Sequence, residues 1–443
     1  LTETFRTAAA HILINREGPA LQPGPRRYTR SWIRDGAIMA DALLRVGCGE
    51  AVRDYLRWYA GFQAVNGAIP CCVDREGPDW LAEHDSPGQF LHAIAEYARL
   101  TGDHALVIEL WPAVLKTLDY LEGLRKTRLS PAFEASGKSA ACYGLLPESV
   151  SHEGYLAHPV HAYWDDFWAL RGLKDAVELA IIMGDTGRAE ALRQWRDDFR
   201  QTLLASLRLT MAERQIDFLP GSVEWADCDP SATAVAVAPI DESHHLPASA
   251  LARTFEVYLQ RFRDCRADRV TWANYTPYEI RVIAALVRLG RREEAWELLA
   301  FFLSDRRPRA WNQWPEIAWH NPASPGHLGD VPHTWIGAEY MLAVVSLFAY
   351  EREADQSLVI AAGVCADWLN PGEEIVVRDL PTQYGRLSYR LGCDETYTWR
   401  LSIAAGLIVP PGGLCFQPPG DRQTHTLRSL PAEVQCRLLS IIT

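Results

Sequence analysis

The sequence lacks the features that define several large classes of protein. Its 443 residues contain no run of basic residues, and 44 Lys and Arg against 56 Asp and Glu give a formal net charge of −12. A surface for nucleic acid is therefore not expected. No apolar run has the length that crosses a bilayer. We expect a chain that binds neither nucleic acid nor a membrane.

Cysteine spacing excludes a further class. The ten cysteines are scattered, Cys71 and Cys72 are adjacent, and no C-x-x-C pair is followed by a matching second pair. This spacing excludes a zinc ribbon and indicates reduced, mostly buried thiols, which favours a cytoplasmic location. The first residue is Leu1 rather than Met, which is compatible with an earlier signal peptide or an upstream domain.

Aromatic residues are abundant instead. The 16 Trp and 16 Tyr stand out from an otherwise ordinary composition of 48% hydrophobic and 23% charged residues. Aromatic side chains in such numbers either fill a thick core or offer flat faces to a ligand. The length of the chain suits one large domain, or one main domain with an appendage.

Four stretches share one pattern, which predicts helical hairpins. Each has an apolar helix end, a Gly, a short polar turn, an Ala at the next helix start and an aromatic residue further on; the stretches are 43–58, 97–111, 180–195 and 286–301. Gly after a helix allows a left-handed C-cap, and a short link joins antiparallel helices. Because the spacing between the stretches is irregular, we expect a closed helical toroid rather than an open solenoid.

The remaining segments divide into loops and a β-rich region. Residues 66–85, 127–163, 214–246 and 306–333 are rich in Pro, Gly, Ser and His, and we predict that these loops carry function. After about residue 355, short β-branched or aromatic runs alternate with Gly, Pro and Asn. The predicted fold is therefore mainly α, with a helical toroid over residues 1–355 and a small antiparallel β-domain over 356–443.

Two clusters of Trp and carboxylates lie at predicted helix starts. The stretch WIRDGAIMA places Trp32, Arg34 and Asp35 before an apolar helical rhythm. The stretch HAYWDDFWAL places Asp165 and Asp166 among aromatic residues. An Asp at either place can be an ordinary N-cap. In the second cluster, burial beside aromatics and a neighbouring carboxylate would raise the pKa of an Asp, which suits a proton donor near neutral pH.

A third cluster occupies residues 311–344. Glu316 lies in a loop with Trp311, Trp314 and Trp319, and Trp335 lies on the helix that follows. Glu316 is either a surface acid between stacking residues or a general base that holds a water against a sugar. Two further stretches, 145–155 and 271–286, add polar and aromatic residues near predicted helix starts: His152, Glu153, Trp272 and Asn274.

Together these clusters predict a saccharide pocket. Helix starts that follow long loops would gather at one rim of a toroid. Aromatic faces, scattered carboxylates and an Arg suit an uncharged, hydroxyl-rich ligand. We expect Trp32, Arg34 and Asp35 to form the floor, and two carboxylates far apart in the sequence to flank a glycosidic bond.

Three motifs resemble those of the glucoamylase-like, six-hairpin (α/α)6-toroid glycosidases. YTRSWIRDGAIMADALL is similar to their W-x-R-D-(S/G)-A element, AYWDDFW to their element of an aromatic residue, Trp and an acidic pair, and QWPEIAW to their Pro-Glu loop. The resemblance implies Asp165 as the general acid, Glu316 as the general base, and a sugar subsite that includes Trp32, Arg34 and Asp35. The Asp-Asp pair is closer to the trehalase-like relatives than to the Glu-Glu pair of glucoamylases.

The resemblance further implies an inverting glycoside hydrolase that acts on an α-glucoside-like oligosaccharide, with no metal and no organic cofactor. Inversion places the two carboxyl groups roughly 6.5–9.5 Å apart, against about 5–5.5 Å for retention. The substrate-binding residues are expected to be Trp32, Arg34, Asp35, Asp166, His152, Glu153, Tyr163, Trp164, Trp272, Asn274, Trp314 and Trp335.

Three other functions stay open. A glycoside phosphorylase on the same fold would replace the activated water by phosphate, with His152, His161, His320 and His333 as candidate contacts. A non-catalytic saccharide-binding protein would keep the pocket without turnover, although binding alone does not require two isolated carboxylates. A sugar epimerase would use paired His, which this sequence places mainly in loops. The sugar, the linkage and the oligomeric state are not predicted.

Overall fold

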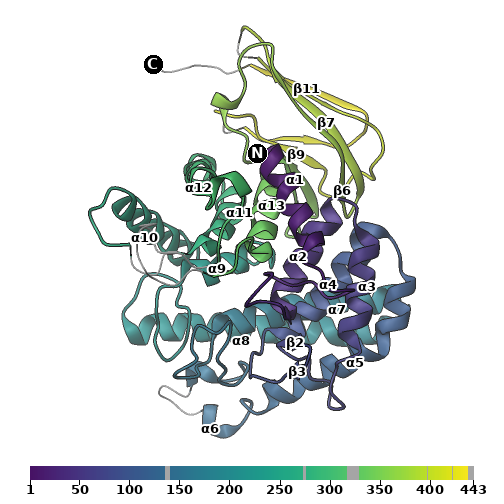
Figure 1. Cartoon of the computed structure of the whole chain (residues 1–443), viewed down its shortest axis with the longest axis vertical. Helices are drawn as coiled ribbons and strands as arrows, with labels where there is room; N and C mark the ends of the chain where they lie inside the picture. The colour runs from purple at the N-terminus through teal and green to yellow at the C-terminus, as the bar shows by residue number, and fades with distance from the viewer. Residues whose placement is uncertain (135–139, 273–275, 317–328, 397, 422, 438–443) are drawn as a thin grey trace.

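The structure is a computed structural model that describes residues 1–134, 140–272, 276–316, 329–396, 398–421 and 423–437. It is mainly helical, and most of its strands lie together above the helices in Figure 1. The α-helices are α1 (Thr2–Ile14), α2 (Ile33–Arg45), α3 (Gly49–Ala60), α4 (Ser86–Thr101), α5 (Ala105–Lys126), α6 (Pro131–Glu134), α7 (Tyr163–Ile182), α8 (Thr186–Arg214), α9 (Pro230–Val237), α10 (Ala248–Arg266), α11 (Arg281–Arg288), α12 (Arg292–Ser304) and α13 (Thr334–Phe348).

Six of these helices form an inner layer in which each contacts the next. α2 packs on α4, α4 on α7, α7 on α9, α9 on α11, α11 on α13, and α13 on α2, so that the order of contacts closes on itself. The helices α3, α5, α8, α10 and α12 pack against the inner helices that precede them, and α1 packs against α13. Every inner helix therefore has an outer partner.

The four predicted helix–turn–helix joints lie between α2 and α3, α4 and α5, α7 and α8, and α11 and α12. Gly102 ends α4 with φ 70°, and Gly290 after α11 has φ 73°; both lie in the left-handed region that favours glycine. The pairs α9–α10 and α13–α1 do not carry the sequence pattern, because α1 comes from the beginning of the chain and residues 238–247 join α9 to α10.

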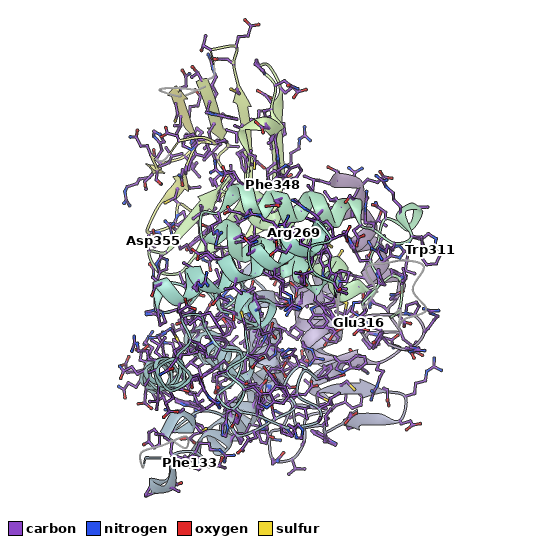
Figure 2. All side chains as sticks on the ribbon, turned by 90° about the vertical axis from the view of Figure 1, so that its left-hand side faces the viewer. Phe133, Arg269, Trp311, Glu316, Phe348 and Asp355 are labelled. Atoms are coloured by element: carbon purple, nitrogen blue, oxygen red, sulfur yellow. The ribbon has the colours of Figure 1, made fainter. Side chains whose placement is uncertain are left out.

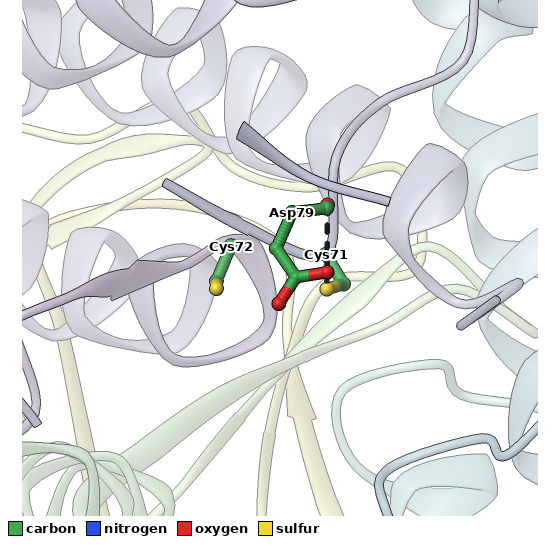
Figure 3. Close-up of side chains that lie close together, drawn as sticks. All are labelled: Cys71, Cys72 and Asp79. Carbon is green, nitrogen blue, oxygen red and sulfur yellow. Dashed lines mark hydrogen bonds between the residues drawn. The ribbon is translucent and has the colours of Figure 1, made fainter. Parts of the chain in front are cut away.

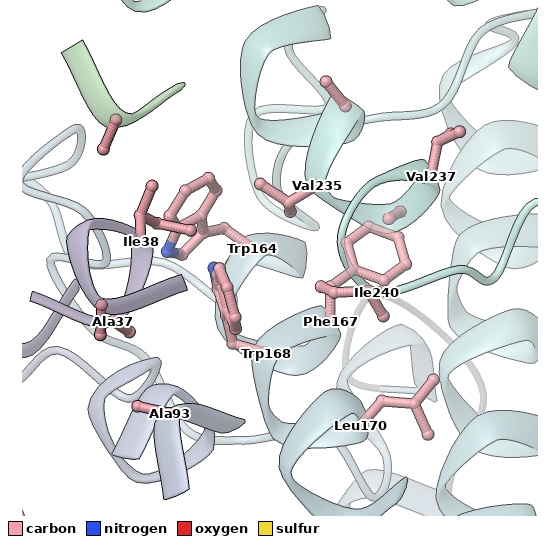
Figure 4. Packing of buried hydrophobic residues seen from close by; sticks show 14 of the residues in the cluster. Ala37, Ile38, Ala93, Trp164, Phe167, Trp168, Leu170, Val235, Val237 and Ile240 are labelled. Carbon is pink, nitrogen blue, oxygen red and sulfur yellow. The ribbon is translucent and has the colours of Figure 1, made fainter. Parts of the chain in front are cut away.

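The inner helices are buried on nearly all sides. Every residue of α2 from Ile33 to Leu44 is buried, since α2 contacts α3, α4 and α13. In Figure 4, Trp164 and Trp168 of α7 lie between Ile38 of α2 and the helix α9. The aromatic residues of the second sequence cluster therefore contribute much of the core between neighbouring inner helices.

Helices α4 and α7 approach each other closely because glycines lie at their crossing. A Cβ atom on Gly88 of α4 would lie 2.1 Å from the carbonyl oxygen of Trp168 in α7. A Cβ atom on Gly172 of α7 would lie 2.8 Å from the Cα atom of Gly88. The crossing has no room for a larger side chain at either glycine, and the two helices bring their N-terminal ends to the same rim.

The strands form three small sheets. The first has the order β1 (Ser31–Trp32), β2 (Cys72–Asp74) and β3 (Gly77–Asp79), and its strands β2 and β3 lie in the segment 66–85 that was predicted to be loop. The second has the order β10 (His425–Leu427), β9 (Leu414–Phe416), β5 (Ser357–Ile360) and β4 (Ala349–Arg352). The third has the order β11 (Ala432–Arg437), β8 (Thr398–Ile403), β7 (Gly385–Cys393) and β6 (Glu374–Thr382).

The C-terminal strands lie in the region that was predicted to be a small antiparallel β-domain, with two differences from the prediction. They begin at Ala349, directly after α13, rather than at residue 356. The pairs within these two sheets are antiparallel except β5 with β9, which run parallel and are separated in the sequence by β6, β7 and β8 of the third sheet. Buried residues of both sheets, such as Leu358, Leu391 and Trp399, form a core of their own.

Ion pairs join the β4 end of this unit to the helices. Glu351 of β4 lies 3.0 Å from Arg45 at the end of α2, and Glu353 lies 2.7 Å from Lys174 of α7. In Figure 2, Asp355 and Glu316 lie on opposite sides of the helical part. The β unit is therefore fixed near the end of the inner layer that lies away from the Glu316 loop. Among the described residues, no helix has the combined length and apolar character that crossing a membrane requires.

Candidate functional site

An open cavity of about 420 Å³ lies where the N-terminal ends of α2, α9, α11 and α13 meet. Loops before α7 and α13 complete its wall. Its lining residues are Tyr28, Trp32, Arg34, Asp35, His152, Glu153, Gly154, Leu156, Asp229, Ser231, Ala232, Thr276, Tyr278, Arg281, Glu316, His333 and Trp335. Helix starts far apart in the sequence thus meet around one cavity, called here the N-terminal cavity.

Glu316 enters this cavity from its loop with two phenols on its carboxylate. The hydroxyls of Tyr28 and Tyr278 both donate to it, the latter at 2.8 Å. Burial raises the pKa of each phenol, as does the Glu316 charge, so both remain protonated donors. The hydroxyl of Thr276 donates to the Glu316 backbone carbonyl at 2.9 Å. Glu316 is therefore held as a hydrogen-bond acceptor at a fixed place in the wall.

Glu153 enters the cavity from the loop before α7. Its Oε1 atom accepts a 3.1 Å hydrogen bond from the Trp32 indole and lies 3.7 Å from Arg34. The Glu153 side chain is 41% exposed, so it is open to a ligand. Glu153 and Ser151 have φ values of 62° and 54°, in the left-handed region that is uncommon for residues other than glycine. Such strained backbone persists where the surroundings over-determine it, and it clusters at functional sites.

Asp35 lies in the floor of the N-terminal cavity, where the charges of Glu153 and Glu316 act on its carboxyl group. Burial raises the pKa of Asp35 to about 8; the nearby Arg34 opposes this rise, and the charges of Glu316 and Glu153 add to it. Asp35 is therefore mainly protonated at neutral pH and can donate a hydrogen bond. The carboxyl groups of Asp35, Glu153 and Glu316 share one electrostatic environment although they come from three separate segments of the chain.

Two buried arginines supply the positive charge of the floor. Arg34 lies 2.7 Å from Glu83 and 3.8 Å from Asp85, so these two buried acidic side chains balance the charge of its guanidinium. Arg281 lies 2.9 Å from Glu339. The Arg281 guanidinium also lies 5.0 Å from the ring centroids of both Trp164 and Trp335, at a distance typical of cation–π contacts.

Seven of the residues predicted for a sugar site line the N-terminal cavity: Trp32, Arg34, Asp35, His152, Glu153, Glu316 and Trp335. The acidic pair of α7 does not. Asp165 is 1% exposed, and its carboxyl group accepts hydrogen bonds from Ser149 and, at 2.9 Å, from Ser151. Asp166 accepts a 2.9 Å hydrogen bond from the Leu146 backbone. Both carboxyl groups lie behind the cavity wall.

The other predicted aromatic contacts lie in the core. The Tyr163 hydroxyl contacts hydroxyl groups of α8, and the Trp314 indole donates to the Phe302 carbonyl at 2.9 Å. Trp272 stacks on Phe301, with ring centroids 5.3 Å apart. These large side chains fill gaps between helices. In the sequence, such buried aromatic residues cannot be distinguished from aromatic residues that contact a ligand. Trp164 lies deeper than the cavity, where its indole donates to Asp85 at 2.7 Å. Asn274 lies outside the described residues.

Among the lining residues without a role in the sequence prediction are Tyr28, Asp229 and Arg281. Tyr28 precedes the first cluster and reaches Glu316 across the cavity. Asp229 caps α9 through a 2.9 Å hydrogen bond from the Ala232 backbone, and its Asp-Pro pair is an ordinary helix-start signal that would have identified it. Arg281 stands inside an apolar helix, and no local signal indicates that its side chain turns toward the cavity.

Two groups of described residues bring possible metal ligands together, and neither suits a cation. The sulfur atoms of Cys71 and Cys72 and a carboxylate oxygen of Asp79 lie within 4.8 Å of one another (Figure 3). Arg30 already binds Asp79 at 3.1 Å, and a hydrogen bond with Cys72 and burial raise the pKa of the Cys71 thiol. A guanidinium and a protonated thiol disfavour a metal ion.

The second group is Cys142, His161 and Glu224. The Nδ1 atom of His161 lies 2.7 Å from Glu224, and its Nε2 atom accepts a 3.0 Å hydrogen bond from Arg128. Both ring nitrogens of His161 therefore have partners that would have to leave before a metal could bind.

A larger cavity of about 510 Å³ lies at the C-terminal ends of the inner helices. Many of its charged side chains pair with one another, as Arg45 does with Glu351 and Lys174 with Glu353. Such pairs fix the β unit on the helices and leave little charge for a ligand. The N-terminal cavity, with its exposed Glu153 and aromatic walls, is the better candidate for a functional site.

No family model and no curated protein matches the sequence. The structure is similar to solved glycosidases. One, described as a wild-type glycosidase, has a TM-score of 0.55 at 16% identity over 78% of this chain and 96% of that chain. The GH78 family rhamnosidase of Bacillus sp. GL1 has a TM-score of 0.59 at 15% identity over 91% of this chain and 39% of that chain. A rhamnosidase from Klebsiella oxytoca, solved with rhamnose bound, has a TM-score of 0.51 at 18% identity over 77% of this chain and 63% of that chain. The chain therefore has the fold of these glycosidases.

Proposed function

We propose that this chain is a glycoside hydrolase built on the (α/α)6 toroid, with the N-terminal cavity as its active site. The cyclic order of inner-helix contacts and the six outer partners support the toroid. One observation carries the proposal of hydrolysis: Glu153 and Glu316, from separate loops, line the same aromatic cavity, and the charges of both raise the pKa of the Asp35 carboxyl group. A pair of carboxyl groups in one cavity is the minimum that acid–base cleavage of a glycosidic bond requires.

In the proposed mechanism, Glu316 is the general base and Glu153 is the general acid. A general acid must reach the leaving oxygen directly or through one water, and Asp165 does not line the cavity. Glu153 replaces Asp165 in this role because its side chain is exposed there. Glu316, oriented by Tyr28 and Tyr278, would remove a proton from water as that water attacks the anomeric carbon.

The lining suits a neutral sugar. Trp32, Trp335 and Tyr28 offer apolar ring faces, and the paired Arg34 adds hydrogen-bond donors without a net local charge. The protonated Asp35 can donate to one hydroxyl and accept from another. We propose an α-D-glucoside as the substrate, with inversion at the anomeric carbon. One similar glycosidase was solved with glucose and another with rhamnose, so an α-L-rhamnoside is the substrate to compare.

The test is a screen of aryl α-D-glucosides, aryl α-L-rhamnosides and α-linked oligosaccharides with the purified chain. Proton NMR of the first product, recorded before the sugar mutarotates, identifies its anomer. We expect release of the β-anomer from the α-glucoside. Release of the α-anomer would contradict inversion, and absence of any product beside measurable sugar binding would favour a saccharide-binding protein.

Phosphorolysis has less support in the cavity. His152 and His333 line it, but burial lowers the pKa of each to about 3, so both are neutral at physiological pH. Of the other two candidate histidines, His161 does not line the cavity and His320 lies outside the described residues. Phosphate would therefore meet neutral rings, carboxylates and two arginines that are already paired with Glu83 and Glu339. Sugar 1-phosphate formed in phosphate buffer would reverse this conclusion.

A further inference from the structure

The segment that presents Glu153, residues 149–155, is an irregular loop tied down at its base. Ser149 and Val160 exchange two backbone hydrogen bonds of 3.0 Å each. The Val150 backbone donates to the carbonyl of Ala82 at 3.0 Å. The left-handed residues Ser151 and Glu153 lie beyond this base, so other contacts must hold the strained conformation.

Asp165 provides such contacts. Its two carboxyl oxygens accept separate hydrogen bonds from the hydroxyls of Ser149 and Ser151. The Ser149 hydroxyl oxygen in turn accepts a 2.8 Å hydrogen bond from the Ser151 backbone. A single carboxyl group thus fixes the base of the loop and the residue two positions before Glu153.

The position of Asp165 on α7 makes it a rigid anchor. It lies in the first turn of a 20-residue helix, between Trp164 and Asp166, and is 1% exposed. Asp85, at the start of α4, lies nearby, and burial together with its charge raises the pKa of Asp165 to about 8.

The same contacts orient His152, the neighbour of Glu153. The Ser151 hydroxyl contacts the His152 Nδ1 atom at 3.1 Å as well as the Asp165 carboxyl group. His152 lines the N-terminal cavity, so the same serine also positions a ring of the cavity wall.

We propose that Asp165 is a positioning residue: through Ser149 and Ser151 it fixes the loop 149–155, and so sets the place of the Glu153 carboxyl group and of the His152 ring in the cavity. This inference rests on the proposed role of Glu153. A misplacement of about 1 Å in a reacting group can cost about 100-fold in rate. Loss of the Asp165 contacts should therefore slow the step that needs Glu153 without preventing substrate binding.

The experiment compares Asp165→Asn with Asp175→Asn. Asp175 lies on the same helix, is equally buried and binds Arg171 and His92 instead of the loop. Two substrates are used, a phenyl glycoside with a poor leaving group and a dinitrophenyl glycoside with a good one, on the sugar that the unaltered chain hydrolyses. A good leaving group departs without a proton, so its hydrolysis reports little on the general acid.

We expect Asp165→Asn to lower kcat for the phenyl glycoside about 100-fold, to lower it only a few-fold for the dinitrophenyl glycoside, and to leave KM nearly unchanged. A Ser149→Ala, Ser151→Ala double variant should behave in the same way. Asp175→Asn should reduce thermal stability without changing the ratio of the two rates.

Equal slowing of the hydrolysis of both substrates by Asp165→Asn would mean that Asp165 has a structural role only. A loss on the phenyl glycoside as large as that of Glu153→Gln, with unchanged backbone hydrogen exchange of residues 149–155, would mean that Asp165 is itself the acid.

Hydrogen exchange of the backbone separates this inference from the proposed function. Amides of residues 149–155 should exchange faster in Asp165→Asn than in the unaltered chain, and at the normal rate in Asp175→Asn. Unchanged exchange in Asp165→Asn would overturn the anchoring role, whatever the substrate. Faster exchange in a chain that hydrolyses no glycoside would keep the anchor and reject the proposed function.

Discussion

Asp35→Asn should stabilise the protein, and the gain should grow with pH. Asp35 is 3% exposed, and burial raises its pKa to about 8, whereas an unfolded Asp titrates near 4. Between these two values the folded protein holds a proton on Asp35 that the unfolded chain has released. Stability therefore falls as pH rises through this window, by about 1.4 kcal/mol for each pH unit.

Asn has no proton to release, so the variant lacks this loss. The difference in unfolding free energy between Asp35→Asn and the unaltered protein should rise by about 3 kcal/mol from pH 5 to pH 7, and should level off above pH 8. Urea denaturation followed by tryptophan fluorescence at pH 5, 6, 7 and 8 measures it. The exposed variant Glu190→Gln on α8 is the control and should show no such trend. A difference that stays constant with pH would mean that Asp35 is ionised in the folded protein, and the reasoning about the cavity floor would be wrong.

Three further variants test particular contacts. Tyr278→Phe removes one donor to Glu316 and should lower kcat about 10-fold with little effect on KM, measured with an aryl glycoside. Arg281→Met leaves Glu339 buried without its 2.9 Å partner and should cost about 3–5 kcal/mol in urea denaturation, whereas an unchanged midpoint would contradict the pairing. Trp168→Ala opens a hole between α7 and its neighbours and should cost about 3–5 kcal/mol in the same assay, and a cost below 1 kcal/mol would contradict its place in the core.

The helical joints and the position of the cavity could be predicted because both depend on local chemistry. Gly102 and Gly290 end helices where the pattern of apolar residues stops, and a glycine there needs no tertiary contact to adopt a positive φ. Asp35 and Asp229 both stand at helix starts, and the closed order of the inner helices brings such starts together. The lining of the cavity by Trp32, Arg34 and Asp35 follows from this arrangement.

The roles proposed for Asp165 and Glu153 could not be predicted from local sequence. Asp165 has the raised pKa expected for a buried acid among aromatics, but a raised pKa also fits a carboxyl group that anchors a loop. Asp165 contacts Ser149 and Ser151 of the loop 149–155 rather than the cavity, and these contacts have no signal in the sequence around Asp165. The left-handed backbone of Glu153 is likewise imposed by contacts distant in the sequence, since no glycine marks that position.

The aromatic clusters were ambiguous for a related reason. Trp314 and Trp272 have the same neighbours in sequence as a ligand-binding Trp would have, yet they fill spaces between helices. Trp335 differs only because its helix begins at the rim of the cavity. Tertiary position, rather than residue type, separates the two uses of an aromatic side chain.

The most direct test of the account is the turnover of Glu153→Gln and Glu316→Gln on an aryl glycoside with a poor leaving group. Both carboxyl groups line one cavity, and loss of either a general acid or a general base should lower kcat about 100- to 10,000-fold while thermal unfolding stays close to that of the unaltered chain. Near-normal turnover by either folded variant would remove that residue from the mechanism and contradict the assignment of the N-terminal cavity as the active site.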